Sequence, residues 1–246
     1  MAYNPSMFPY DPQLLAIVQT PPRTIDELIN GLKKINNICE DSDGVKWFNT
    51  LYLRVTVEVK RYLDEGRFND PAWLELLDVQ FGRFYYLAMI AVLQGNRCPG
   101  CWRVPLSVRH DTRIARIQFA LAGMNAHINY DLPQAIVATA RISNLPPDEG
   151  TAQHQDFLSI NPLLADLIDE AKAELSVRLL GDPLPTLSHV GDTIAAWGIK
   201  AARSKAWKHS ETLWAIRNLP LLTEGFVDGL DGLTTFGNKT LLVPVR

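Results

Sequence analysis

Signals that start helices recur along this chain, and they constrain its fold more than any other feature. Thr24-Ile25-Asp26-Glu27 has the pattern of a capping box, while Asp70-Pro71 and Asn161-Pro162 each place a proline directly after a capping residue. Between these signals, apolar residues recur three or four positions apart, as they do from Trp47 to Tyr62. Proline or glycine closes the segments. The pattern therefore predicts an all-α fold.

The same punctuation predicts a single-domain bundle of six to eight helices over residues 24–217. Residues 1–23 are proline-rich and are expected to form an extended N-terminal arm. Residues 218–246 contain Pro220 and several glycines, and are expected to form an irregular C-terminal tail packed on the domain. Helices are expected at residues 25–39, 44–63, 71–94, 107–129, 132–142, 161–180 and 190–217, with a break at 181–185.

Composition and charge place the chain among ordinary soluble proteins. Of its 246 residues, 47% are apolar and 21% are charged. The formal net charge of −3 argues against a nucleic-acid partner, which normally selects for a basic excess. The N-terminus lacks the basic and apolar regions of a signal peptide, and the longest apolar run, Phe84–Leu93, is too short to span a bilayer. We expect a cytoplasmic protein with no membrane span.

The chain has three cysteines, Cys39, Cys98 and Cys101, and this odd, low count is unlike a secreted disulfide scaffold. Cys98-Pro99-Gly100-Cys101 has the spacing of a redox pair or of half a zinc site. A second CxxC is missing, and Pro-Gly is also a common turn sequence. An inert turn is therefore the preferred interpretation over a redox or metal role.

The segment Gly123–Pro133 interrupts an apolar helical pattern with several polar side chains. Buried polar groups cost free energy unless they have partners, so this segment either fastens helices together or builds a site. His127 is the leading catalytic candidate, because the ordinary imidazole pKa of about 6.5 suits proton transfer at neutral pH. Asp131, one turn later, could hold one tautomer of the ring, and Asn125 and Asn129 could orient substrate oxygens from the opposite side of the helix.

Structural roles stay open for the same residues. Asp131-Leu132-Pro133 also has the pattern of a cap followed by a first-turn proline. Asn125 and Asn129 could bond the free carbonyls at the end of the preceding helix. His127 has no comparable capping role, and so it is the residue that a structural interpretation explains least.

A second candidate surface lies on the last predicted helix, where Arg203 and Trp207 share one stripe. Arg203 could bind an anion or stack on a flat ligand. The preferred interpretation is structural, with the tryptophans in the core and Arg203 paired with a carboxylate such as Asp78. The predicted substrate-binding residues are Asn129, Tyr130, Arg203, Trp207 and Asp78.

Motifs for nucleotide cofactors and for a serine nucleophile are missing, since the chain has no GxGxxG, no P-loop and no GxSxG. A metal site could draw on His127 with Asp131, on His189 with Asp192, or on the pairs at 110–111 and 154–156. This set is diffuse and has no HxH or HExxH. We therefore expect no cofactor and no metal, and keep a zinc or iron site as an alternative.

Three stretches resemble a known family: Leu51–Thr56, Leu77–Val79 and, above all, Gly123–Pro133. The family is one of unknown function, found in bacteria and some fungi, with the hallmark GMNAHIN-x-DL. The hallmark is intact here, and the resemblance covers most of residues 24–217. It implies one all-helical domain and a shared role for the motif, but it implies no activity.

These features favour a cofactor-independent enzyme that acts on a small, largely apolar organic molecule by a non-redox cyclisation, isomerisation or lyase step. The predicted catalytic residues are His127, Asn125 and Asp131. One alternative is a metal-dependent hydrolase of phosphoesters or lipids. Another is a non-catalytic ligand-binding protein in which the motif is a structural latch. The sequence leaves open whether the protein forms a homo-oligomer.

Overall fold

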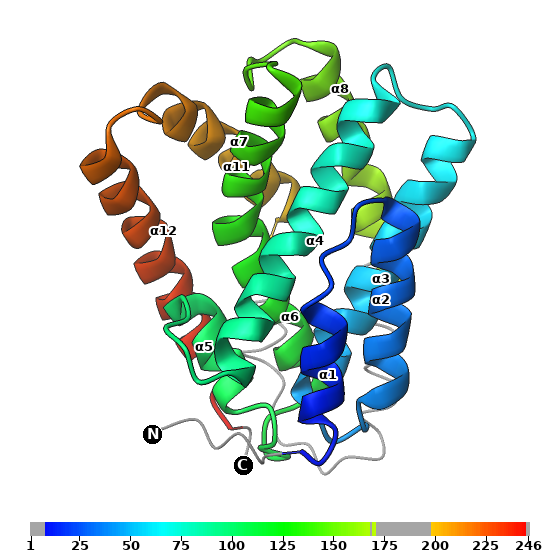
Figure 1. The fold of residues 1–246 in the computed structure, drawn as a ribbon, viewed down its shortest axis with the longest axis vertical. Helices are drawn as coiled ribbons and strands as arrows, with labels where there is room; N and C mark the ends of the chain where they lie inside the picture. The colour runs from blue at the N-terminus through cyan, green and yellow to red at the C-terminus, as the bar shows by residue number, and fades with distance from the viewer. Residues whose placement is uncertain (1–7, 168, 171–197, 245–246) are drawn as a thin grey trace.

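The computed structural model describes residues 8–167, 169–170 and 198–244, and every regular element within these ranges is helical. The elements are α1 (Asp11–Val18), α2 (Ile25–Ile38), α3 (Gly44–Asp64), α4 (Pro71–Leu93), α5 (Gly100–Ser107), α6 (Arg116–Ala126), the π-helical segment η1 (His127–Asp131), α7 (Leu132–Ser143), α8 (Ala152–Ser159), α11 (Ile199–Ala215) and α12 (Pro220–Leu241). Residues 161–167 are also helical. In Figure 1, α4 and α7 lie side by side between α2 and α3 on one side and α12 on the other. The all-α prediction is confirmed.

The predicted caps of α2, α3 and α4 form as the sequence indicates. The side chain of Thr24 accepts a hydrogen bond from the backbone N–H of Glu27, which starts α2. Asp43 caps α3 by accepting from the N–H of Val45, and Asp70 caps α4 by accepting from the N–H of Trp73. These bonds are local in sequence, which is why the starts of α2, α3 and α4 could be predicted from short patterns.

Both ends of the chain are more helical than expected. The arm expected to be extended holds α1, and the tail expected to be irregular holds the long helix α12. The glycines of α12 made it hard to predict, but the helix gains its stability from packing on α5 and α6. Leu230, Thr234 and Asn238 form its buried face. The expectation of a packed tail is thus right, and the expectation of irregular structure is wrong.

Two further differences from the sequence prediction concern α6 and α8. The helix expected over 107–129 begins at Arg116, because α5 occupies residues 100–107 and a loop follows it. The helix α8 was not expected, although Thr151 caps it by accepting from the N–H of His154. Parts of the predicted helices at 161–180 and 190–217, the break at 181–185, and the residues His189, Asp192 and Trp197 lie outside the described residues.

Helix α4 lies at the centre of the bundle, as predicted. It contacts α1, α2, α3, α5, α7, α8 and η1. By length and composition alone it would be long and apolar enough to cross a membrane, but 56% of its most apolar window is buried inside the protein. A central helix of a bundle has the same properties, so the composition of α4 is weak evidence for a membrane span.

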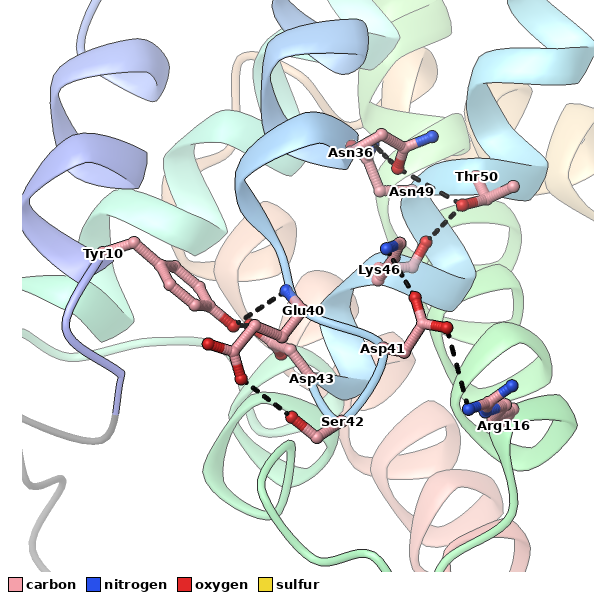
Figure 2. Close-up of polar contacts among 10 residues, drawn as sticks. All are labelled: Tyr10, Asn36, Glu40, Asp41, Ser42, Asp43, Lys46, Asn49, Thr50 and Arg116. Atoms are coloured by element: carbon pink, nitrogen blue, oxygen red, sulfur yellow. Dashed lines mark hydrogen bonds and ion pairs between the residues drawn. The ribbon is translucent and has the colours of Figure 1, made fainter. Parts of the chain in front are cut away.

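Polar contacts tie the first helix to the turn between α2 and α3 (Figure 2). The hydroxyl of Tyr10 donates to Asp43 and accepts from the backbone N–H of Glu40. Asp43 also lies 2.9 Å from the guanidinium of Arg109, which forms a second ion pair with Asp11. Because both carboxylates share one buried cation, this cluster fixes α1 against the remainder of the bundle.

Candidate functional site

A π-helical turn shapes the centre of the hallmark segment. The backbone N–H of Leu132 bonds the carbonyl of His127, five residues back, so η1 is wider than an α-helical turn. Asp131 does not cap α7, which corrects the capping interpretation: its backbone is helical and its side chain makes no capping bond. Instead its Oδ2 accepts from Nε1 of Trp102 on α5 and lies 2.8 Å from Nδ1 of His127. A long-range contact therefore takes the place of the local cap.

The ring of His127 is held among aromatic side chains and is only 2% exposed. It stacks on Phe81 of α4, with 3.4 Å between ring centroids and 6° between planes. The rings of Phe48 and Tyr52, both on α3, meet it edge-on at 5.5 and 4.7 Å. Gly123 makes room for this arrangement, since a Cβ there would lie 2.3 Å from Cγ of Phe48. Among the described residues, Nε2 of His127 has no hydrogen-bond partner.

His127 lines a cavity of about 60 Å³ at the junction of α3, α4, η1 and α11. At about 10–15 Å³ for one water by the same measure, the cavity has room for roughly four to six water-sized groups. Twelve apolar side chains form most of its wall: Phe48, Leu51, Val55, Val59, Leu74, Leu77, Phe81, Met124, Ile128, Leu132, Ile160 and Leu164. The remaining lining residues are Tyr52, Asp78, His127 and Arg203. A mostly apolar wall with a few polar groups is typical of small-molecule sites.

Two of these polar residues face the cavity without bonds that would satisfy them. Within the part of the chain that the structure describes, the hydroxyl of Tyr52 and Oδ2 of Asp78 have no hydrogen-bond partner, although neither atom is accessible to solvent. Burial raises the pKa of Asp78 to about 7, against the opposing effect of the positive charge of Arg203. Burial also raises the pKa of Tyr52 well above its ordinary value, so this phenol stays protonated.

Arg203 brings a positive charge to the cavity. Its Nε donates to Oδ1 of Asn161 and its Nη2 to the carbonyl of Phe157, while its guanidinium lies over the Phe157 ring. The expected pairing of Arg203 with Asp78 is thus replaced by these two bonds, although both residues line one cavity. Burial lowers the pKa of Arg203 to about 9, which the charge of Asp78 partly opposes, so Arg203 keeps its charge at pH 7.

Burial also shifts the pKa values of His127 and Asp131, whose side chains contact each other. It lowers the pKa of His127 well below its ordinary value and raises that of Asp131 well above it. Burial therefore favours the uncharged form of both groups. With a proton on Oδ2 of Asp131, Nδ1 of His127 accepts the hydrogen bond and Nε2 carries the ring hydrogen. In this state His127 presents a hydrogen-bond donor to a ligand.

The asparagines of the segment fasten α12 to the bundle. Nδ2 of Asn125 donates to Oδ1 of Asn238 and to the carbonyl of Thr234, at 2.8 and 3.1 Å. Asn129 donates to the side chain and carbonyl of Asn125, and Asn238 donates to the carbonyl of Cys101 on α5. Asn125 and Asn129 were predicted as catalytic and substrate-binding residues, but neither lines the cavity.

The other predicted residues also lie apart from the cavity lining. Trp207 is 1% exposed and packs among Trp73, His154 and Phe157, as the structural interpretation expects. Tyr130 is half-buried and packs on the edge of the main core. Of the eight predicted site residues, the structure thus brings His127, Asp78 and Arg203 together at one cavity. Asp131 supports His127 from behind.

Sequence reasoning missed the role of Tyr52, which belongs to an apolar stripe that reads as ordinary core. A tyrosine at such a position was the available signal, because its hydroxyl needs a partner when it is buried. Phe81 was likewise expected only as core, and its stacking on His127 depends on tertiary structure.

The cysteines and histidines give no further cluster among the residues described. Cys39, Cys98 and Cys101 are free and buried. Burial raises the pKa of Cys98 to about 12 and that of Cys101 further, which is the opposite of a reactive thiolate. In the described ranges, no group of three or more His, Cys, Asp and Glu side chains could hold a metal ion.

Comparison with known proteins places the chain in a family. The model of a family of unknown function (DUF5995) matches residues 25–244, so the chain belongs to this family. The match extends through α12, beyond the end at 217 that the sequence resemblance suggested. No curated protein and no solved structure matches the chain.

Proposed function

We propose that this protein is a cofactor-independent cytoplasmic enzyme that acts on a small, largely apolar organic molecule by a non-redox isomerisation, lyase or cyclisation step. One observation carries the proposal: Tyr52, Asp78 and His127, from three different elements, line one apolar cavity, and each has a buried polar atom without a partner among the described residues. Leaving such an atom unsatisfied costs about 1–3 kcal/mol. A substrate that supplies the missing partners would recover this cost.

The residues of the cavity have complementary capacities. Asp78, with a pKa near neutrality, can take or give a proton at pH 7. His127 and Tyr52 can donate hydrogen bonds to a substrate oxygen. Arg203 favours negative charge that develops nearby. Asp131 is a positioning residue that fixes the orientation and tautomer of His127.

The apolar cavity wall and the buried thiols support the same proposal. Its apolar lining favours a substrate with little charge, and the room for roughly four to six water-sized groups limits the reacting part to a small ring or short chain. The unpaired buried thiols fit a reducing compartment.

Ligand-observed NMR with a library of small apolar oxygen-containing compounds tests the proposal. Compounds that bind the wild type should lose binding to Val55→Phe, which places a ring in the cavity. His127→Ala should lower turnover of a bound substrate by about 10²–10⁴-fold. His110→Ala is the matched control, because His110 is exposed and does not line the cavity.

Three outcomes would contradict the proposal. If Val55→Phe folds and binds every hit as the wild type does, the cavity is not the site. If hits bind but are always recovered unchanged, the protein is a ligand-binding module. If turnover is abolished by a chelator and the purified protein carries about one equivalent of zinc or iron, the protein is a metal-dependent hydrolase or lyase.

A further inference from the structure

The polar atoms around the cavity differ in whether they can donate or accept a hydrogen bond. In the described part of the chain, the hydroxyl of Tyr52 and Nε2 of His127 have no partner, and the two ring centroids are 4.7 Å apart. The hydroxyl can donate a hydrogen bond, and so can Nε2 in the tautomer that carries the ring hydrogen there. Asp78 presents an oxygen with no partner in the described part of the chain. Two adjacent donors match the two lone pairs of a single carbonyl oxygen.

Asp78 lies on the same helix face as the residue beneath His127. Phe81 follows Asp78 by three positions on α4, and the His127 ring stacks on Phe81. After burial itself, the charge of Asp78 is the largest cause of the raised pKa of Tyr52. The carboxyl group therefore lies near the Tyr52 hydroxyl, and Asp78, Tyr52 and His127 all line the same cavity.

We propose that the substrate is a small neutral carbonyl compound with a C–H bond next to its carbonyl group, and that Asp78 moves the proton of that carbon while Tyr52 and His127 hold the carbonyl oxygen. This inference rests on the proposed function and gives its substrate class. A neutral compound suits the twelve apolar lining residues, because an ionised one would lose most of its hydration against them.

The step balances without any added reagent. The carboxylate of Asp78 takes the proton, the C–H bond breaks, and its electron pair forms a carbon–carbon double bond while the carbonyl π electrons move to oxygen. Tyr52 and His127 stabilise this enolate through hydrogen bonds, and the positive charge of Arg203 favours it over the neutral substrate. In a substrate with a carbon–carbon double bond directly beyond that carbon, Asp78 returns the proton to the far end of the conjugated enolate, which gives an isomer with no net oxidation.

Deuterium exchange tests the inference with a defined probe. Acetone, with four non-hydrogen atoms, is small enough for the cavity, and its protons next to the carbonyl are replaced by deuterium in D₂O only when they are abstracted. Proton NMR should show exchange in the presence of the wild-type protein well above the buffer rate. Asp78→Asn should slow the protein-dependent exchange by at least about 100-fold. Asp228→Asn, an exposed carboxylate on α12, is the matched control and should exchange as the wild type does.

Acetamide is the binding probe, because it has the planar shape and the electron-rich oxygen of the acetone enolate. By calorimetry it should bind the wild type more tightly than acetone does, as expected for an intermediate analogue. Asp78→Asn should keep acetamide binding. Tyr52→Phe should weaken it by roughly tenfold, because one donor to the oxygen is lost.

The outcomes separate this inference from the proposed function. Binding of acetamide and acetone without exchange would overturn the carbonyl inference and leave the small-molecule site standing. Exchange that persists in a folded Asp78→Asn protein would also overturn it, since another group would be the base. If neither probe binds while other library compounds bind the cavity, the substrate class is wrong. If no compound binds at all, the proposed function fails as well.

Discussion

Replacing Asp78 by asparagine should make the folded protein more stable, and the gain should grow as the pH rises. Burial raises the pKa of this carboxyl from 3.8 to about 7 in the folded protein. At 1.36 kcal/mol for each pH unit, that difference corresponds to about 4 kcal/mol of destabilisation when the group is charged in both states. The asparagine side chain carries no charge to desolvate and has nearly the same shape as aspartate, so the substitution should recover most of this cost.

The direction of the pH dependence follows from proton binding. The folded protein holds the Asp78 proton more tightly than the unfolded chain does, so the stability from this group is fully present below its ordinary pKa of 3.8. It is lost as the pH rises toward the folded-state value of about 7. Between about pH 5 and about pH 8, the advantage of Asp78→Asn over the wild type should therefore increase by roughly 2–3 kcal/mol.

Urea unfolding, followed by circular dichroism at several pH values in this range, measures the difference directly. Asp228→Asn is the control, and its stability relative to the wild type should not change with pH in this way. A constant difference between Asp78→Asn and the wild type from about pH 5 to about pH 8 would refute the reasoning. The carboxyl would then be solvated, and it would not be a poised acid or base.

Three other predictions concern the support around the site. Asn125→Ala should cost about 1–3 kcal/mol and increase hydrogen exchange in α12, because it removes both bonds to that helix; exchange confined to other helices would contradict this. Gly123→Ala should cost about 1–3 kcal/mol in thermal or urea unfolding because its Cβ meets an aromatic ring, whereas Gly232→Ala, in open space on α12, should be neutral or stabilising; equal effects would contradict the packing argument. Cys98 and Cys101 should react with a thiol reagent only as fast as the protein unfolds, and rapid labelling of the native state would show that they are reactive.

The helices that the sequence predicts well are those whose signals are local. Thr24, Asp43 and Asp70 bond backbone N–H groups within three residues, so a short pattern contains the whole interaction. Asp131 has the same kind of pattern, but its partners are His127 and a tryptophan 29 positions away. The helix α12 escaped prediction for a related reason, since its stability comes from contacts with distant helices.

The residues of the candidate site can likewise be divided into those that the sequence indicates and those that only the tertiary structure shows. His127 and Asp78 could be found from sequence because an ionisable side chain in an apolar stretch is conspicuous. Their meeting at one cavity could not, because it depends on the stacking of the imidazole on Phe81. Tyr52 could not be separated from the core residues around it, since only the tertiary structure shows that its hydroxyl has no partner in the described ranges.

The hallmark segment itself separates structural residues from functional ones. Asn125 lies two positions before His127 in the same chain segment, and its amide is joined to α12 and to Asn129. The fold can therefore satisfy buried polar groups in this region when their role is to hold helices together. His127 is satisfied on the Nδ1 side alone, and its Nε2 has no partner in the part of the chain that the structure describes. Because Tyr52 and Asp78 share this condition and line the same cavity, a common ligand accounts for all three costs at once. Tyr85, Thr139 and Trp207 also bury a polar atom without a partner in the described ranges, so it is the shared cavity, and not the missing bond alone, that distinguishes Tyr52, Asp78 and His127.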